Sequence, residues 1–436
     1  CGKTVALASG ASQTGFGREG SVDWQTGSIK TTTFTAVSGE GYFVDTSSGA
    51  VTANLPAGSA GAIVSFADYT RTFGTNTLTI SPNGSEKIGG IADDARLTVD
   101  GQAATFVYVD STEGWINVQN AEDTETGNSF ITATGGTITT VNCGVCKVHT
   151  FTGPGTFCVS ALATVPANNQ VSYMVVGGGG GAGTQETGSG GTGGGGAGGF
   201  REDKSPTTPY TASPLEGAGA ITVTATAFPI TVGGGGTGGP ATVPSASKGG
   251  NGNNSQFSTI TSAGGGGGGA SRSSLEPGAN GGSGGGSGQT GGPPFSGGTG
   301  NTPPVTPPQG NNGGSASIPS ASPNFAGGGG GGATAVGANI TTTTGGNGGA
   351  GATTGINGSN TAFAGGGGGG TYEGGTVGTG GAGGGGAGGT SNQNATGTAG
   401  TANTGGGAGG SSTANNGTPV AGANGGSGVV IIRYKF

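Results

Sequence analysis

Runs of glycine recur between Gly177 and Gly428, and they limit what this chain can fold into more than any other feature. Glycine supplies 113 of the 436 residues, against a usual level of about 7%. A glycine run has no side chains to bury and loses more conformational entropy on ordering than any other sequence. Any ordered structure in this region must therefore be held together by backbone N–H and C=O groups.

The glycine runs resemble one another in length and are separated by polar spacers of comparable length. A flexible glycine and serine spacer remains the alternative on composition alone, but such a linker has no reason to repeat. The spacing is not Gly-X-Y, which excludes collagen. The runs are Gly177–Gly183, Gly190–Gly199, Gly233–Gly239, Gly264–Gly269, Gly278–Gly292, Gly327–Gly332, Gly345–Gly351, Gly365–Gly370, Gly378–Gly389 and Gly405–Gly410.

Polyglycine can form an extended helix with three residues per turn, a rise of about 3.1 Å and no internal hydrogen bonds. Without side chains, such rods can approach closely and bond to one another through their backbones. We therefore expect an array of polyglycine II rods, with the polar spacers as loops at its two ends. If the rods alternate in direction, Thr184–Ser189, Ala241–Lys248 and Ser271–Pro277 meet at one end.

Two apolar segments, "SYMVV" and "GVVIIRYKF", bracket the glycine region. An exposed "VVIIRY" would be an aggregation hazard unless it were paired. We predict that Met174–Val176 forms a strand beside Val429–Ile432, and that Ala220–Val232 is also strand-like. These strands would join the glycine block to the rest of the protein.

Up to Gln119 apolar and polar residues alternate between turn signals, which predicts an all-β unit of about six or seven strands. Two hairpins are expected. One joins Gly41–Asp45 to Ala50–Leu55 through "TSSG", and the other joins Lys147–Thr152 to Thr156–Ser160 across "GPG". The predicted fold class is an all-β fibre region plus a glycine-rich domain of packed polyglycine II helices capped by β-strands, with essentially no α-helix.

The shifts in composition divide the chain into six segments. They are an N-terminal connector or stem (1–37), a β-rich module (38–120) for which the family resemblance given below implies a trimeric fibre, a linker (121–128), a β-hairpin docking region (129–176), the glycine-rich domain with its end loops (177–428) and a closing strand (429–436).

Charge and composition narrow the functional classes. The net charge is −7 and only 8% of residues are charged, which argues against a nucleic-acid partner. No run of apolar residues is long enough to insert in a membrane. With one histidine in the chain, we expect no catalytic site, no cofactor and no enzyme activity. Cys1 is compatible with a lipid-bearing processed N-terminus or with a fragment boundary.

The remaining cysteines form a C-x2-C-x2-H-x8-C spacing with His149, which could supply four zinc ligands. Against zinc, Cys146 and His149 would lie on opposite faces of a strand, and we predict no metal site. A disulfide from Cys143 or Cys146 to Cys158 would suit an extracellular particle. Cys146–Cys158 is the candidate pair, and unpaired thiols are the remaining alternative.

Two parts of the sequence resemble a known family. "SGEGYFVDTSSGAVTANLPAGSAGAIVSFADY", with the later "NTLTISPNGSEKIGG" and "FVYVDSTEGWINV", is similar to a small β module of tail fibres from tailed bacteriophages, especially marine ones. "KVHTFTGPGTFCV", "YMVVGGGGGAG" and "GGSGVVIIRY" resemble the glycine-rich domain that often ends such fibres. The resemblance implies a homotrimeric fibre whose distal glycine block packs as polyglycine II helices.

The function expected from these features is a non-enzymatic tail fibre or distal adhesin on the virion. Its partners would be a host surface glycan or outer-membrane protein, and other tail fibre or baseplate proteins. The candidate receptor contacts are Arg272, Leu275 and Tyr372. The alternative is a bacterial cell-surface filament or matrix protein that assembles laterally through its glycine-rich packing.

Overall fold

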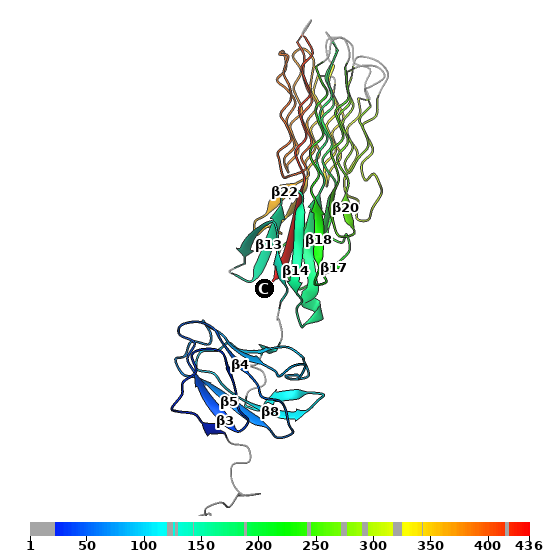
Figure 1. Ribbon diagram of the computed structural model, residues 1–436. Coiled ribbons are helices and arrows are strands. Elements are labelled where there is room, and N and C mark those ends of the chain that lie inside the picture. The colour runs from blue at the N-terminus through cyan, green and yellow to red at the C-terminus, as the bar shows by residue number, and fades with distance from the viewer. Residues whose placement is uncertain are drawn as a thin grey trace, which may run out of the picture. The chain divides into compact units, whose positions relative to one another are not determined.

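The chain forms two compact units, Cys1–Ser129 and Phe130–Phe436, which are described separately (Figure 1). In the part of the chain that the structure describes there is no α-helix, only a 3-10 turn, η2 (Pro166–Asn169). No helix in that part is long and apolar enough to cross a membrane. The computed structural model describes residues 22–119, 125–126, 130–142, 144–186, 190–241, 246–271, 277–289, 295–316, 325–341, 343–414 and 418–436.

The first unit is a sandwich of two five-stranded sheets, named here sheet A and sheet B. From β2 to β6 successive strands alternate between the sheets, so that β3 and β5, like β4 and β6, run parallel. Sheet A has the order β1 (Asp23–Trp24), β3 (Glu40–Val44), β5 (Ile63–Asp68), β8 (Ala103–Asp110), β9 (Gly114–Asn117). Sheet B has the order β10 (Glu125–Thr126), β7 (Ala95–Leu97), β6 (Leu78–Ser81), β4 (Val51–Asn54), β2 (Phe34–Thr35).

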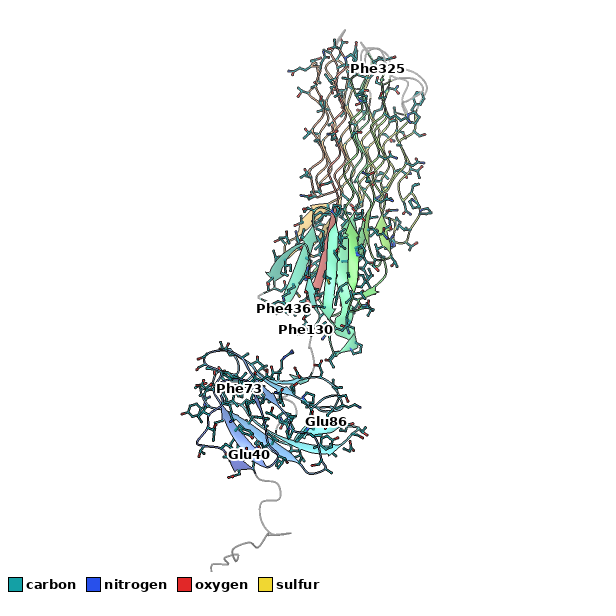
Figure 2. All side chains as sticks on the ribbon, in the orientation of Figure 1. Glu40, Phe73, Glu86, Phe130, Phe325 and Phe436 are labelled. Atoms are coloured by element: carbon teal, nitrogen blue, oxygen red, sulfur yellow. The ribbon has the colours of Figure 1, made fainter. Side chains whose placement is uncertain are left out.

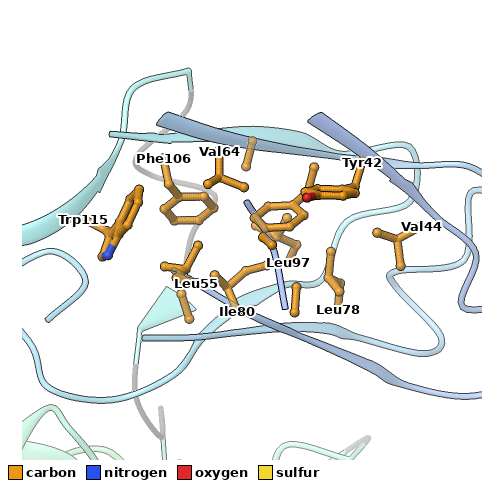
Figure 3. Packing of buried hydrophobic residues seen from close by; sticks show 14 of the residues in the cluster. Tyr42, Val44, Leu55, Val64, Leu78, Ile80, Leu97, Phe106 and Trp115 are labelled. Carbon is orange, nitrogen blue, oxygen red and sulfur yellow. The ribbon is translucent and has the colours of Figure 1, made fainter. Parts of the chain in front are cut away.

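The core of this unit lies between its two sheets (Figure 3). The predicted hairpin between Gly41–Asp45 and Ala50–Leu55 is wrong, because β3 belongs to sheet A and β4 to sheet B. Both strands turn one apolar face inward, with Tyr42 and Val51 buried, so the turn carries the chain across the core instead of beside itself. β1 and β2 also belong to these sheets, so the sandwich begins before the predicted boundary at residue 38.

The second unit begins with two sheets, named sheet C and sheet D. Sheet C has the order β11 (Thr132–Thr134), β14 (Gly155–Ala161), β18 (Ala227–Thr231), β19 (Ser255–Phe257), β20 (Ile260–Ser262). Sheet D has the order β12 (Thr137–Val141), β13 (Cys146–Phe151), β23 (Val429–Lys435), β15 (Gln170–Val176), β16 (Phe200–Asp203), and β17 (Ile221–Thr222) also pairs with β15. β21 (Ala352–Thr354) and β22 (Thr361–Phe363) form a separate hairpin.

The predicted pairing of the two bracketing strands is confirmed. β15 and β23 are antiparallel neighbours, with Met174 opposite Ile431 and Val176 opposite Val429. Both strands are buried on both faces, because one face of sheet D packs on sheet C and the other on Ala352, Ile356 and Phe363. This double burial explains why their sequences are apolar without alternation.

The predicted hairpin across "GPG" is wrong. β13 lies in sheet D and β14 in sheet C, so the turn crosses between the two layers. Phe151 and Phe157 then enter the same core from opposite sheets. Burial of these two rings on both sides of the sandwich outweighs the local preference for a tight hairpin.

Beyond the sheets, the glycine runs extend as parallel and antiparallel rods (Figure 1). The rod at 177–185 shows how they are held. Backbone N–H groups that are three residues apart donate to the same neighbouring rod. Three neighbouring rods therefore accept the hydrogen bonds of successive residues. Gly177 and Gly180 donate to Gly199 and Gly196, Gly178 and Gly181 to Asn253 and Gly250, and Gly179 and Ala182 to Gly426 and Ala423, at 2.8–3.0 Å.

The carbonyls of the same rod accept from three further rods. Gly178, Gly179 and Gly180 accept from Gly265, Gly236 and Ala408 respectively, at 2.8–3.0 Å. This rod therefore has six bonded neighbours and a repeat of three residues, as polyglycine II requires. The glycine-rich region is an ordered array held by backbone hydrogen bonds, in agreement with the predicted fold class.

Candidate functional site

Of the predicted receptor contacts, Arg272 and Leu275 lie outside the described residues. Tyr372 is described, and it is only 7% exposed. Its ring packs against Phe325, with the ring centroids 6.0 Å apart. Burial, and then the nearby charge of Glu373, raise its pKa. Tyr372 helps to close the end of the array instead of presenting its ring to a partner.

The rods end in a layer of larger side chains on the side away from sheets C and D, which we call the tip; Figure 2 labels Phe325 there. Short backbone bridges join neighbouring rods at this level, such as Gln185 to Ser271 and Tyr372 to Thr413. Thr184 N–H donates to the Ser247 carbonyl at 2.8 Å. Thr184–Ser189, Ala241–Lys248 and Ser271–Pro277 were predicted to meet at one end of the array. Their described residues Thr184, Ser247 and Ser271 do lie together there.

Two described loops at the tip present polar groups to solvent. They span 371–376 and 389–395, and we call them the tip loops. Asn392, Gln393 and Asn394 are exposed, while Glu373 is half-buried. The Asn392 amide lies against Gly374, 3.9 Å from where a Cβ on that glycine would stand. Asn392 of one loop therefore lies beside Gly374 of the other.

Both tip loops contain residues in the left-handed region of backbone space. The φ angles are +27° for Glu373 and +59° for Asn392. Such angles are uncommon for residues other than glycine and persist where the surrounding structure fixes them. The exposed amide side chains of Asn392 and Gln393 can donate and accept hydrogen bonds with a polar surface.

The exposed residues Asn392 and Gln393 were not among the predicted contacts, which included the aromatic residue next to Glu373 instead. The available signal was the strand-free segment "TSNQN" between two glycine runs, which is rich in turn-forming residues. The aromatic ring of Tyr372 fills space where the rods end, whereas Asn392, Gln393 and Asn394 remain in solvent.

The cysteines do not form the predicted disulfide. Cys146 is a buried free thiol on β13, and Cys158 is an exposed free thiol on β14. The two strands belong to different sheets, which is why they are not neighbours across a hairpin. Cys143 lies outside the described residues, and no group of three or more potential metal-binding side chains occurs among the described ones.

His149, the remaining member of the predicted zinc set, is fully buried between sheets C and D. Its Nδ1 lies 2.7 Å from the Gly135 carbonyl, which makes Nδ1 the protonated nitrogen. Its Nε2 lies 3.1 Å from the Tyr434 hydroxyl. Burial lowers the pKa of His149, and the charge of Lys147 adds to the effect, against the bond to Gly135. His149 is a neutral core residue.

We expect this burial to make the second unit sensitive to acid. The folded state binds the His149 proton less readily than the unfolded chain, whose histidine pKa is about 6.5. The free energy of unfolding is therefore constant above that pH and falls below it, by at most about 1.4 kcal/mol per pH unit. Denaturant titrations at several pH values should show this slope in the natural chain and not in His149→Gln, and equal slopes would contradict the prediction.

Comparison with known families gives one match. A family model described as a glycine-rich domain matches residues 152–435, which include β15, β23 and all of the rods. No curated protein matches the chain in sequence.

Proposed function

This chain belongs to the glycine-rich domain family, and from that premise we propose that it is a tail fibre or distal adhesin of a tailed bacteriophage. It binds a host surface glycan or outer-membrane protein at the tip and catalyses no reaction. Its other partners are tail fibre or baseplate proteins, and it works as a homotrimer on the virion. The resemblance of both parts of the sequence to tail fibres supports this proposal.

The observation that carries the proposal is the scaffold beneath the tip loops. The rod at 177–185 is bonded to six neighbours, and an array held in this way keeps the ends of its loops in place. A binding loop that is ordered in advance loses less conformational entropy when a partner binds. A flexible spacer would give its loops no such advantage.

A cell-surface filament that grows by lateral glycine packing is the second candidate, and the edges of the array disfavour it. Lateral growth needs unpaired backbone groups along the outer rods, as at an open sheet edge. Here exposed asparagine side chains accept backbone N–H groups of adjacent rods. The pairs, at 2.8–2.9 Å, are Gly238 with Asn424, Gly264 with Asn254, Gly267 with Asn251, Gly300 with Asn312, Ser315 with Asn339, and Thr379 with Asn347.

Gold-labelled antibodies against this chain distinguish the two candidates. We expect label at the tail tips of purified phage particles from the same source. Label along helical fibres on bacterial cells, with none on particles, would overturn the proposal in favour of the filament.

Competition for adsorption tests the tip itself. The purified chain should block attachment of the phage to its host, and Asn392→Ala with Gln393→Ala should weaken that block by about tenfold or more. Thr237→Ala, an exposed change on the side of the array, is the matched control and should leave competition unchanged. Equal competition by both variants would show that these tip loops do not bind the receptor.

A further inference from the structure

The outward face of sheet A in the first unit is uncharged. Along β3, β5, β8 and β9 the residues that alternate with the core residues carry no charged side chain. Ile63, Val107 and Ile116 stand side by side across three strands. Phe43 lies beside Ala67 two rows further along, beyond the row of Gly41, Ser65 and Thr105.

Sheet B of the same unit provides the contrast. The positions that alternate with its core residues are polar, among them Thr52, Thr79 and Arg96 in one row. Asn54 and Ser81 form the next row. An antiparallel or mixed sheet with one face in solvent normally has this pattern. Sheet B therefore meets water, whereas sheet A has the composition of a covered surface.

The uncharged face is also closely packed and has little need for water. The Trp24 ring lies over Gly41, where a Cβ would stand 2.8 Å from the ring. The rings of Trp24 and Phe43 are 4.9 Å apart. Ser65 and Thr105, the polar residues at the centre, bond to each other at 2.7 Å. Even so, Trp24 remains 38% exposed in the single chain.

We propose that this face is where copies of the chain associate, and that in the homotrimer of the proposed function the outer surface of sheet A packs against the same surface of the other two copies. Each chain carries a net charge of −7, so an uncharged face meets other copies with less repulsion than a charged one would. Around a three-fold axis like residues of the three copies approach one another, which an uncharged apolar face permits. This inference deepens the homotrimer of the proposed function, but it does not depend on what the tip binds.

A sugar is the other occupant that exposed aromatic rings suggest, and the ring geometry disfavours it. Trp24 and Phe43 are tilted by 35°, and Phe43 and Tyr69 by 69°. Stacking on a sugar chain requires rings that together form a flat platform. Tilted rings with aliphatic neighbours instead interdigitate with another side-chain surface.

Sedimentation equilibrium of the full chain tests the proposal. The natural chain should have a mass three times that of one 40.2 kDa chain. Val107→Glu places a charge at the centre of the face and should weaken association by roughly 100-fold. Thr79→Glu makes the same change on the outward face of sheet B and should leave the mass unchanged.

Fluorescence quenching by iodide keeps the test independent of folding defects. The chain has two tryptophans, and Trp115 is buried in the core, so it serves as the internal reference. Trp24 should be protected in the natural chain and quenched in Val107→Glu, with Trp115 protected in both. Val107→Thr, which keeps a β-branched side chain, should give a smaller loss of association.

Three results would overturn the proposal. They are a monomeric natural chain, an association that Val107→Glu leaves unchanged, and a monomer that is retained on an immobilised polysaccharide through Trp24. Loss of association with adsorption competition retained would separate this interface from the tip.

Discussion

Replacing Gly179 by alanine is expected to destabilise the glycine-rich unit by about 3 kcal/mol or more, the upper range for overpacking. A Cβ at this position would stand 2.1 Å from the Gly406 carbonyl oxygen of a neighbouring rod. The contact cannot be relieved by a side-chain rotation, because the obstructing atom belongs to a backbone. Moving the rod that contains Gly179 away from Gly406 would break the hydrogen bonds of Gly179 with Gly426 and Gly236.

Gly234→Ala is the matched control, with the opposite expected sign. The nearest atom to a Cβ there is 3.7 Å away, on the flexible Asn253 side chain. Alanine adopts the polyglycine II conformation without strain and lowers the entropy of the unfolded chain, so we expect a gain of about 0.5 kcal/mol. Denaturant titration of the full chain measures both changes.

Hydrogen exchange locates the backbone amides that lose protection in Gly179→Ala. Rod amides of the natural chain and of Gly234→Ala should exchange slowly, and those near Gly179 should exchange faster in Gly179→Ala. Equal stability of the two variants would mean that the rods slide past one another easily, which contradicts an array fixed by backbone bonds.

The sequence was most informative where the backbone alone decides the structure. Repeated glycine runs between two apolar strands predicted the rods, their bonding and the pairing of Met174–Val176 with Val429–Ile432. The sequence also contains a signal for the position of a rod within the array. In the rod at 233–239 every third residue is buried, Gly233, Gly236 and Gly239, while Thr237 occupies an exposed position. A period of three in "GGGGTGGP" therefore distinguishes an outer rod from a central one.

Hairpins were predicted wrongly in both units for one reason. Alternation of apolar residues shows that a strand has one buried face, but it does not say whether the next strand lies beside it or opposite it. β3 and β4, like β13 and β14, supply opposite walls of a sandwich. Short turns serve both connections, so the choice depends on tertiary packing that local sequence does not encode.

The candidate site was predicted only in outline. Alternating rods correctly placed the described ends at Thr184, Ser247 and Ser271 together. Tyr372, one of the predicted contacts, is buried, because a large ring at the end of a rod gains more from packing on Phe325 than from exposure. Which loop residues are exposed depends on the length of the polar spacer that forms each loop.

Replacing Arg433 by alanine is expected to destabilise the second unit by about 3 kcal/mol. Arg433 is fully buried on β23. Its guanidinium donates to the carbonyls of Gly355 and Ile356, both at 3.2 Å, and of Pro209 at 2.7 Å. The cation also lies 5.0 Å from the centre of the Tyr210 ring. Without this side chain, buried carbonyls lose their donors and a cavity remains.

The variants at this position separate the charge from the hydrogen-bonding geometry. Arg433→Lys keeps the charge but cannot reach three carbonyls with one ammonium group, so it should recover only part of the loss. Lys435→Met is the control on the same strand. Lys435 is half-buried, and its ammonium group lies 5.2 Å from the centre of the Phe130 ring. Its loss should cost less than about 1 kcal/mol. If Arg433→Ala cost no more than this control, the loops at 209–210 and 355–356 would be held by apolar packing alone. The closing strand β23 would then contribute backbone pairing, but no polar side-chain bonds, at the base of the rods.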